Sequence, residues 1–206
     1  MTVVVTATGT DVGKTVFAAA LTAALDGCYW KPVQAGVEGG SDRDRVRSLS
    51  GLSDERLFPE TYRLSTPCSP HRAAEIDGVT IAVDALAPPA CSRPLVIEGA
   101  GGVLVPFTRQ LTFADIVADW RLPAVLVAAT ALGTISHSLT AIEALRTRGV
   151  PILGIAFVGD AVEDSEATIA AMGGVKRLGR LPILDPLNAI TLRAAFAANF
   201  SMADFQ

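Results

Sequence analysis

The sequence predicts an α/β fold in three layers, in which helices cover both faces of a mostly parallel central sheet. Short runs rich in β-branched residues, without alternating polar positions, are typical of strands buried on both faces. Such runs recur along the chain, with segments of helix-forming composition between them. Strand and helix alternating in this way favour a parallel sheet joined by right-handed crossovers.

The expected elements follow one another in a regular order. "TVVVTA" (2–7) is the first strand, and "KTVFAAALTAAL" (14–25) is the helix after it. Further buried strands are expected at 28–33, 94–100, 123–130 and 151–158, with helices at 112–120 and 135–148. Prolines interrupt the segment from 53 to 92, which indicates an excursion from the sheet rather than a second domain. We therefore expect one domain over residues 1–206.

Composition excludes several classes of protein. Half of the residues are hydrophobic and 18% are charged, which does not fit a disordered chain. Cys28, Cys68 and Cys91 are odd in number and too widely spaced for a disulfide framework or a zinc site. The net charge of -4 argues against a nucleic-acid or anionic-membrane surface and favours small-molecule partners. Without a basic leader or an apolar run of about 18 to 20 residues, a cytoplasmic location is expected.

The segment after the first strand, "TATGTDVGKTVF" (6–17), is similar to a phosphate-binding loop with altered spacing. A standard loop has a glycine five positions before the glycine of Gly-Lys-Ser/Thr, where this chain has Thr8, and its nearest glycine is Gly9. Successive backbone N–H groups, a helix N-terminus and the charge of Lys14 nevertheless suit a triphosphate, and Thr15 offers a hydroxyl to Mg²⁺. The alternative is an ordinary glycine-rich turn in which Lys14 is merely solvated.

Two further strand ends carry charged residues at the edge where parallel sheets bind ligands. Glu98 follows the aliphatic run "LVI", and a carboxylate there needs a cationic partner, for which Mg²⁺ is suited. Lys31 closes the apolar stretch "CYW" and is expected beside Lys14 and Glu98, where it would serve a substrate that becomes anionic during phosphoryl transfer. The alternatives are a metal-free pair of Glu98 with either lysine, and a solvated Lys31. The glycines expected to leave room for a ligand are Gly99, Gly101 and Gly102.

Together these segments resemble the dethiobiotin synthetases, a family with a deviant phosphate loop and a three-layer P-loop NTPase-like fold. The resemblance spans most of the chain in the order "VTATGTDVGKT", "KPVQAG", "SPH", "VIEGAGGVLVP", "TFADIV", "LGTISHSLTAIEAL" and "LGIAFV". It implies an ATP- and Mg²⁺-dependent cyclo-ligase that converts 7,8-diaminopelargonic acid and CO2 into dethiobiotin. A carbamate forms on one amine, ATP phosphorylates it, and the second amine closes the ureido ring, so the site must position both amines.

The resemblance also implies roles for individual residues. Those expected to bind the nucleotide and its metal are Thr10, Asp11, Val12, Gly13, Lys14, Thr15, Val16, Asp42, Glu98, Gly99, Gly101, Gly159, Pro182, Ile183 and Leu184. Mg²⁺ would be held by Thr15, Asp42 and Glu98, but Asp44 is an alternative to Asp42, and both aspartates also fit solvated charges at a helix start. The catalytic residues would be Lys31, Lys14 and Thr10. The substrate would be bound by Thr10, Lys31, Ala35, Gly101, Thr134, Ile135 and Ser136.

In this family the substrate carboxylate lies near a two-fold interface, so the resemblance implies a homodimer. The segment "LGTISHSL" (132–139) matches the helix whose N-terminus faces that carboxylate from the partner subunit, and Thr134 or Ser136 is expected to cap it. His137 and His71 are expected in packing or loop roles, because no serine and carboxylate partner can be identified for either.

This chain departs from the family pattern at three positions. Asp11 stands where Glu is common, and Ala35 replaces a hydroxyl residue, which predicts altered substrate affinity with the same reaction. Gly159 stands where an Asn usually contacts adenine, so we expect relaxed nucleotide selectivity. The segment "LGRLPILDP" (178–186) is expected to run along the base.

Two other functions fit parts of the pattern. Partition and cell-division ATPases share a deviant loop but need a second lysine near its start, where positions 7–10 are Ala-Thr-Gly-Thr. The segment "LRAAFAANFSMADFQ" also lacks the basic face of a membrane-targeting helix. Amidotransferase-like relatives would need an added glutamine-hydrolysing domain, for which the chain has no room. The ligase therefore fits better than either alternative.

Overall fold

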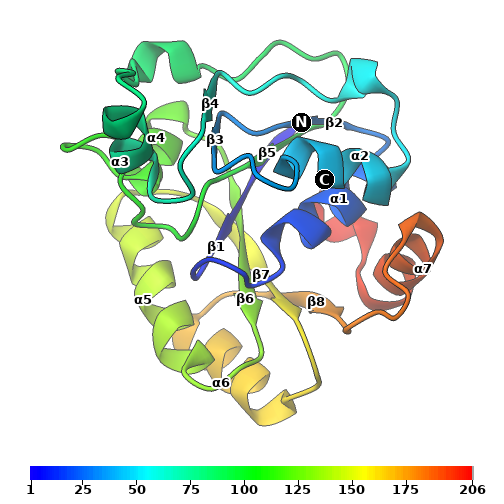
Figure 1. Cartoon of the computed structure of the whole chain (residues 1–206). Coiled ribbons are helices and arrows are strands. Elements are labelled where there is room, and N and C mark those ends of the chain that lie inside the picture. Colours follow the sequence, from blue (N-terminus) through cyan, green and yellow to red (C-terminus); the bar gives the residue numbers. More distant parts are fainter. Residues whose placement is uncertain (206) are drawn as a thin grey trace.

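The centre of the molecule is a sheet of six parallel strands in the order β2-β5-β1-β6-β7-β8 (Figure 1). The structure is a computed structural model and describes residues 1–205. The strands are β1 (Thr2–Ala7), β2 (Cys28–Trp30), β5 (Leu95–Glu98), β6 (Ala124–Ala129), β7 (Ile152–Val158) and β8 (Arg177–Leu181). In β1, Val5 pairs with Glu98 of β5 and Ala7 pairs with Val127 of β6. The loop after β1 therefore leaves the middle of the carboxyl edge of the sheet.

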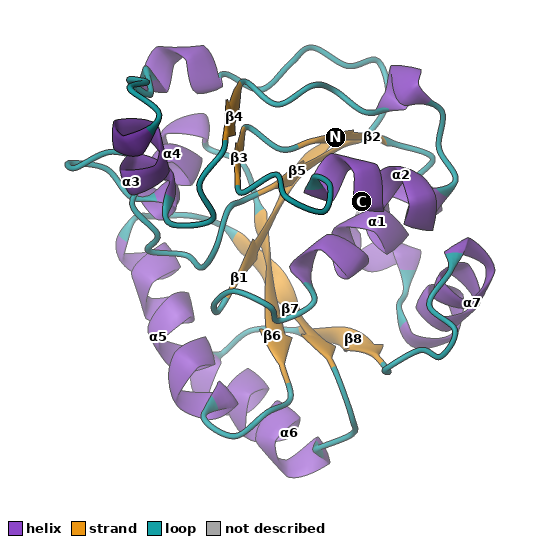
Figure 2. Ribbon diagram, viewed as in Figure 1, coloured by secondary structure: helices purple, strands orange, loops and turns teal. Residues whose placement is uncertain are grey.

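Helices cover both faces of this sheet, which confirms the predicted three-layer α/β fold (Figure 2). One face is covered by α1 (Lys14–Ala24), α2 (Asp42–Ser50) and α7 (Ala189–Asn199), the other by α4 (Phe113–Trp120), α5 (Thr134–Thr147) and α6 (Glu163–Gly173). Val3 and Val5 of β1 pack with Phe17 of α1, whereas Val4 between them belongs to the core under α4 and α5. Successive side chains of a strand point to opposite faces of the sheet. Because helices cover both faces, every position of the strand is buried, and polar residues do not alternate with apolar ones.

The strand predicted for residues 28–33 is split between two sheets. β2 ends at Trp30, and the chain turns away through Lys31 and Pro32, which has no N–H group to donate to a ladder. β3 (Val33–Ala35) then pairs with β4 (Tyr62–Leu64) in a separate parallel pair. The turn at Lys31 leaves its side chain at the carboxyl edge of the main sheet.

Several elements were not predicted from the sequence. They are α2, α6, β8 and α7 in the main body, the small pair β3 and β4, and α3 (Pro70–Ile76) with the 3-10 turns Asp54–Arg56, Val83–Leu86 and Met202–Phe205. The sequence of β8 is "RLGRL", and its two arginines and glycine are not the β-branched or aromatic residues that indicate a strand. The 53–92 segment does leave the sheet, as predicted, and packs α3 against β3 and β4.

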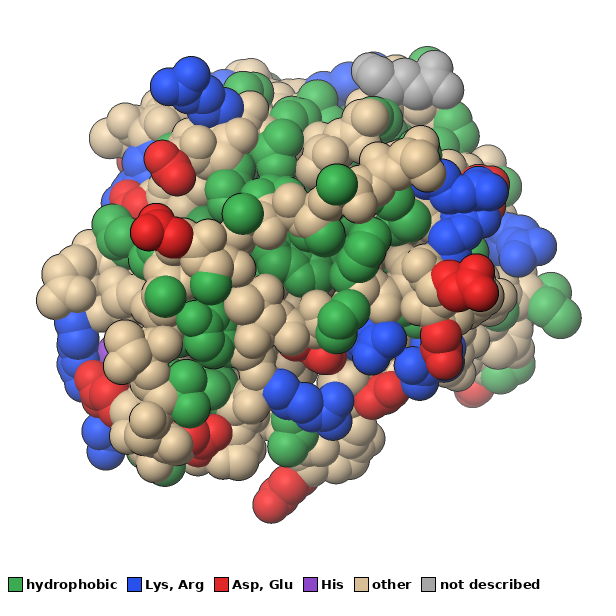
Figure 3. All heavy atoms as spheres, turned by 90° about the horizontal axis from the view of Figure 1, so that it is seen from above, with side chains coloured by type: hydrophobic (Ala, Val, Ile, Leu, Met, Phe, Trp, Pro, Cys, Tyr) green, Lys and Arg blue, Asp and Glu red, His purple; other side chains and the backbone are tan. Residues whose placement is uncertain are grey.

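On the face shown in Figure 3, acidic and basic side chains of the described residues lie interspersed around an apolar centre rather than in a single basic patch. Within residues 1–205 no helix is long and apolar enough to cross a bilayer. Cys68 is exposed, whereas the thiol of Cys91 donates to Cys28 Sγ at 2.7 Å, a contact that their sequence spacing did not indicate.

Candidate active site

The loop between β1 and α1 ends in a glycine that the packing requires. Gly13 precedes α1 with a φ of 87°, in the left-handed region that favours glycine. A Cβ there would lie 2.6 Å from Val158 Cγ1 on β7. Gly13 has no side chain to cap α1, so the first N–H groups of the helix and its positive dipole end face the loop, an arrangement that binds anions.

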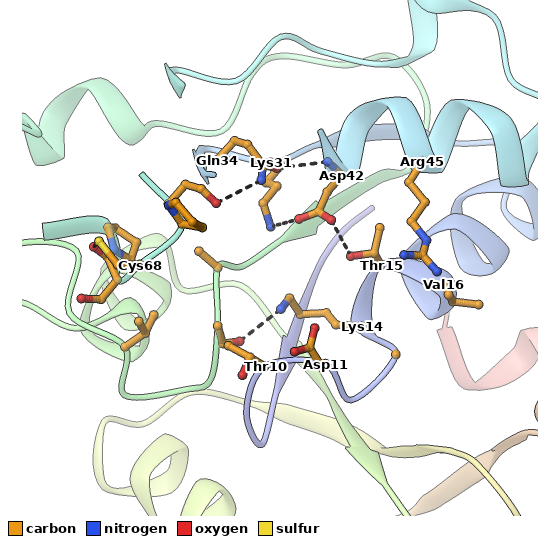
Figure 4. Close-up of a pocket in the computed structure, with 18 residues that line it drawn as sticks. Thr10, Asp11, Lys14, Thr15, Val16, Lys31, Gln34, Asp42, Arg45 and Cys68 are labelled. Atoms are coloured by element: carbon orange, nitrogen blue, oxygen red, sulfur yellow. Dashed lines mark hydrogen bonds and ion pairs between the residues drawn. The ribbon is translucent and has the colours of Figure 1, made fainter. Parts of the chain in front are cut away.

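Lys14 begins α1 and points across the loop. Its Nζ donates to the carbonyl of Gly101, 3.2 Å away in the loop after β5 (Figure 4). Desolvation is the main cause that lowers the pKa of Lys14 to about 8, and the neighbouring charge of Lys31 lowers it further. An anion bound at this amine would favour its charged form, so phosphate binding and protonation of Lys14 support each other.

Thr15, Asp42 and Glu98 meet beside this lysine, although they come from three different elements. Thr15 Oγ1 is 2.7 Å from Glu98 Oε1 and 3.1 Å from Asp42 Oδ1. Glu98 is the last residue of β5 and fully buried, whereas Asp42 begins α2 and is half-buried. Two carboxylates and a hydroxyl form a set of hard oxygen donors of the kind that Mg²⁺ prefers.

Lys31 connects the two carboxylates. Its Nζ lies 2.8 Å from Asp42 Oδ2 and 3.4 Å from Glu98 Oε1, and it donates to the Gly99 carbonyl at 3.1 Å. Burial disfavours its charge, but Glu98 and Asp42 outweigh burial, and the pKa of Lys31 lies above its usual value. With 3% of its side chain exposed, Lys31 is not the solvated surface lysine of the alternative interpretation.

The geometry separates Asp42 from Asp44. Asp44 forms a capping box with Ser41 at the start of α2 and pairs with Arg47 on the surface. Asp42, two residues earlier, faces Thr15 and Lys31 instead. Burial alone would raise the pKa of Asp42, but Lys31 and Lys14 hold it below its usual value. Of the two aspartates, Asp42 is therefore the one placed to bind a metal with Thr15.

Two residues that sequence reasoning did not select also belong to this cluster. Tyr29 on β2 is fully buried, and its hydroxyl donates to Glu98 Oε2 at 2.9 Å. Gln34 accepts from the backbone N–H of Asp42 at 3.1 Å and donates to the Gly36 carbonyl at 2.9 Å. Tyr29 therefore holds the Glu98 carboxylate, and Gln34 holds the backbone at the start of α2. Tyr29 had no sequence signal, because a buried tyrosine within an apolar strand is indistinguishable from core packing.

Beside this cluster, at the carboxyl edge of the sheet, lies a cavity of about 760 Å³, which the fully buried Tyr29 and Glu98 do not line. The predicted site residues that line it are Thr10, Asp11, Gly13, Lys14, Thr15, Val16, Lys31, Ala35, Asp42 and Gly101. Thr134, Ile135 and Ser136 instead line a second cavity, of about 740 Å³, at the start of α5. One chain therefore brings the loop and the lysines together, but holds the α5 residues in a separate place.

Two expectations about individual residues were wrong. Neither Thr134 nor Ser136 caps α5, because Gly133 is the N-cap, and the Thr134 hydroxyl donates to the Ala129 carbonyl at 2.5 Å. Gly99 leaves room for the core rather than for a ligand, since a Cβ there would lie 2.3 Å from the Phe113 ring.

The two histidines lie outside the cluster. His137 is exposed on α5, and the half-buried His71, at the start of α3, donates its backbone N–H to the Pro106 carbonyl at 3.3 Å.

The region expected to hold the base is built from the ends of β7 and β8. Gly159 follows β7, and its N–H donates to the Leu181 carbonyl at 3.0 Å, so Pro182, Ile183 and Leu184 continue from the neighbouring strand. The guanidinium of Arg180 donates to the Gly159 carbonyl at 3.1 Å. A Cβ on Gly159 would lie 2.3 Å from Thr130 Oγ1, so this backbone has no room for a side chain.

Solved structures with the same fold are distant in sequence. A ParA family ATPase from Chlorobium tepidum superposes with a TM-score of 0.52 at 11% identity, over 95% of this chain and 90% of that chain. A chain of the MinC:MinD cell division protein complex of Aquifex aeolicus gives a TM-score of 0.52 at 14% identity, over 94% of this chain and 86% of that chain. At these identities the likeness shows the fold alone. The fold and the loop–lysine–carboxylate cluster together define a P-loop nucleotide-binding protein.

Closer relatives place the chain within that class. A family described as "AAA domain" matches residues 1–191. The ATP-dependent dethiobiotin synthetase BioD of Rhizorhabdus wittichii is 68% identical over 98% of this chain and 97% of its own length. The enzyme of the same name from Novosphingobium aromaticivorans is 63% identical, over 98% of both. The chain belongs to the dethiobiotin synthetase family.

Proposed function

We propose that this chain closes the ureido ring of dethiobiotin from 7,8-diaminopelargonic acid, CO2 and ATP. Membership of the dethiobiotin synthetase family makes it an ATP-dependent ligase of biotin synthesis. One observation carries the proposed mechanism: the ammonium groups of Lys14 and Lys31 flank the same cavity as Thr15 and Asp42. A carbamate and a phosphoryl group are both anionic, and a site with two cations beside a phosphate loop fits both.

The chain's own residues would act in three ways. The N–H groups at the start of α1 and Lys14 would hold the terminal phosphates. Lys31 would hold the carbamate oxygens and stabilise the charge that develops as the phosphoryl group transfers. Thr10 and Gly101 would fix the carbamate and the free amine close together, so that attack on the carbamic-phosphoric anhydride is intramolecular and phosphate leaves.

A magnesium ion fits the donor set at Thr15, Asp42 and Glu98. The Thr15 hydroxyl lies within hydrogen-bond distance of both carboxylates, Tyr29 donates to Glu98, and Gln34 accepts from the backbone N–H of Asp42. No cluster of three His, Cys, Asp or Glu side chains suited to a metal occurs in residues 1–205, so phosphate oxygens and water would complete the coordination. The ion would neutralise charge on the transferring phosphate.

We expect nucleotide selectivity to be relaxed in this chain. Gly159 offers backbone groups where the usual Asn offers an amide, and its φ of 136° and the contact with Thr130 leave no room for a side chain. The value of kcat/KM for GTP and for CTP should therefore fall within about tenfold of that for ATP, since no side-chain hydrogen bond to the base is lost. Steady-state kinetics with the three nucleotides measures this, and a preference for ATP above about a hundredfold would contradict it.

The substrate carboxylate would be held at a dimer interface, by the start of α5 from a second copy of the chain. Gly133 leaves the N–H groups of α5 without a side-chain cap, which suits an anion. Leu132, just before Gly133, is fully exposed in one chain. A second copy of the chain would bury this leucine and would also bring the start of α5 to the substrate site. We further propose that the chain acts as a single domain in the cytoplasm.

Replacing Leu132 with aspartate is expected to dissociate this dimer. A charge placed in the core of an interface costs at least about tenfold in affinity, and the ligase rate should fall because the carboxylate loses its partner contact. Sedimentation velocity at micromolar concentration measures the state. Ile190→Asp is the matched control, because Ile190 is also exposed but lies on α7, over the other face of the sheet. Equal sedimentation of the two variants would count against this interface.

The function itself is tested by phosphate release from ATP, omitting in turn Mg²⁺, bicarbonate and 7,8-diaminopelargonic acid. Release that needs all three, together with dethiobiotin in the product, is the expected result. Slow release that is indifferent to the diamine would instead favour a switch ATPase of the kind that shares this fold. Release that requires glutamine would favour an amidotransferase.

A further inference from the structure

We propose that Arg45 is an additional nucleotide-binding residue, whose guanidinium pairs with the phosphates nearest the nucleoside. The proposal rests on the nucleotide site proposed above, and it adds a contact that the loop motif does not contain. Arg45 lies in the first turn of α2, three residues after Asp42. It lines the same cavity as Thr15 and Val16 (Figure 4).

The backbone that carries Arg45 is held firmly. Its N–H donates to the Ser41 carbonyl at 3.1 Å, within the turn that the capping box of Ser41 and Asp44 closes. Asp42, at the start of the same turn, is bonded to Thr15 of α1, and the next residue, Val46, is fully buried in the core shared with α1. The position of Arg45 relative to the phosphate loop is therefore set by packing.

The guanidinium, in contrast, makes no hydrogen bond or ion pair with any residue in the described range 1–205, and the residue is exposed. Its helical neighbours differ: Arg43 donates to the Leu57 carbonyl at 3.0 Å, and Arg47 pairs with Asp44 and Asp54. Among the three arginines of α2, the one that faces the cavity has its donors free for a ligand.

The two lysines of the cavity already have partners within the protein, and they lie on a different side of Thr15 from Arg45. Lys31 is already paired with Asp42 and Glu98, and the amine of Lys14 is turned toward Gly101. Figure 4 shows Arg45 reaching from α2 toward Val16, on the far side of Thr15 from that amine. Because the lysine of a phosphate loop serves the terminal phosphates, the phosphate nearer the nucleoside falls on the side of Arg45. A planar guanidinium can bind two phosphate oxygens at once.

Such a contact would hold the nucleotide without contacting its base. This fits a chain in which Gly159 provides no side chain for the base. The affinity gained from Arg45 should then be equal for nucleotides that differ only in the base, and present in diphosphates as well as triphosphates.

Calorimetric titration of the full chain with MgADP, MgGDP and MgATP tests this assignment. Arg45→Ala is expected to weaken the binding of all three nucleotides by the same factor, about 5- to 30-fold, which is the size expected when one partly exposed, charge-assisted hydrogen bond is lost. With ATP as substrate, KM should rise by that factor while kcat stays within about threefold, because the transferring phosphate is not touched. The affinities of Arg45→Lys should lie between those of the unsubstituted chain and Arg45→Ala, since lysine keeps the positive charge but lacks the planar donors that bind two oxygens at once.

Arg121→Ala is the matched control. Arg121 is an exposed arginine at the C-cap of α4, just before β6 begins, and therefore at the opposite edge of the sheet. It should leave every dissociation constant unchanged. An unchanged MgADP affinity in Arg45→Ala, a loss confined to MgATP, or an equal loss in Arg121→Ala would each overturn the assignment. MgADP binding needs no ligase activity, so the result for Arg45 does not depend on phosphate release with the diamine.

Discussion

Replacing Lys31 with methionine is expected to lower diamine-dependent phosphate release about 10³-fold, with most of the loss in kcat. Lys31 is buried, charged and within reach of both carboxylates that would share the metal. Methionine keeps much of the apolar stem but removes the charge that would face the carbamate and the transferring phosphoryl group. Rapid-quench or coupled phosphate assays at saturating ATP and diamine measure the change.

The same substitution should also destabilise the protein, and this effect must be separated from the catalytic one. Removing one partner of a buried ion pair typically costs about 3 to 5 kcal/mol, because Glu98 would keep a buried charge. Mg²⁺ with ADP should restore part of that stability by giving the carboxylates another cation. Because that extra stabilisation is binding free energy, MgADP should bind Lys31→Met at least as tightly as it binds the unsubstituted chain. An inactive variant that fails to bind MgADP would signal misfolding, and one that retains activity would exclude Lys31 from the chemistry.

The parts of the site that could be predicted from the sequence are those that chain order alone determines. Lys14 and Thr15 must follow β1, because the loop joins a strand directly to a helix, and Glu98 must lie at the same edge, because parallel strands end together. Even Lys31 was placed correctly, although the strand was expected to continue past it. In these cases a local pattern and the direction of a strand suffice.

The remaining parts depend on how separate segments pack. The choice between Asp42 and Asp44 depends on which carboxylate closes the capping box of α2, and both are compatible with the sequence. The roles of Tyr29 and Gln34 follow from contacts with residues far along the chain or across a turn. β8 was missed because its hydrogen bonds to β7, rather than its composition, make it a strand. The prediction that Thr134 or Ser136 caps α5 was wrong: Gly133 is the N-cap, and the Thr134 hydroxyl donates to the Ala129 carbonyl.

Replacing Asp42 with asparagine is expected to weaken the apparent affinity for Mg²⁺ in the presence of ATP by about 10- to 100-fold, and Glu98→Gln by at least as much. Each change keeps the size of the side chain but removes a negative charge from the donor set with Thr15. Raising the Mg²⁺ concentration should recover part of the activity of Asp42→Asn, because a half-buried ligand can be replaced by water. It should recover less in Glu98→Gln, whose amide would place a donor group against Tyr29 or Lys31.

Asp44→Asn provides the matched comparison for this site, because the two aspartates lie two positions apart on the same helix. Loss of the Asp44 charge should lower stability by about 1 kcal/mol through the capping box and leave the Mg²⁺ dependence unchanged. Phosphate release titrated with Mg²⁺, alongside thermal unfolding, distinguishes the outcomes. If Asp44→Asn shifted the Mg²⁺ titration and Asp42→Asn did not, the metal would lie on the outer side of α2, away from Thr15, and the phosphoryl-transfer geometry proposed around Lys31 would have to be abandoned with it.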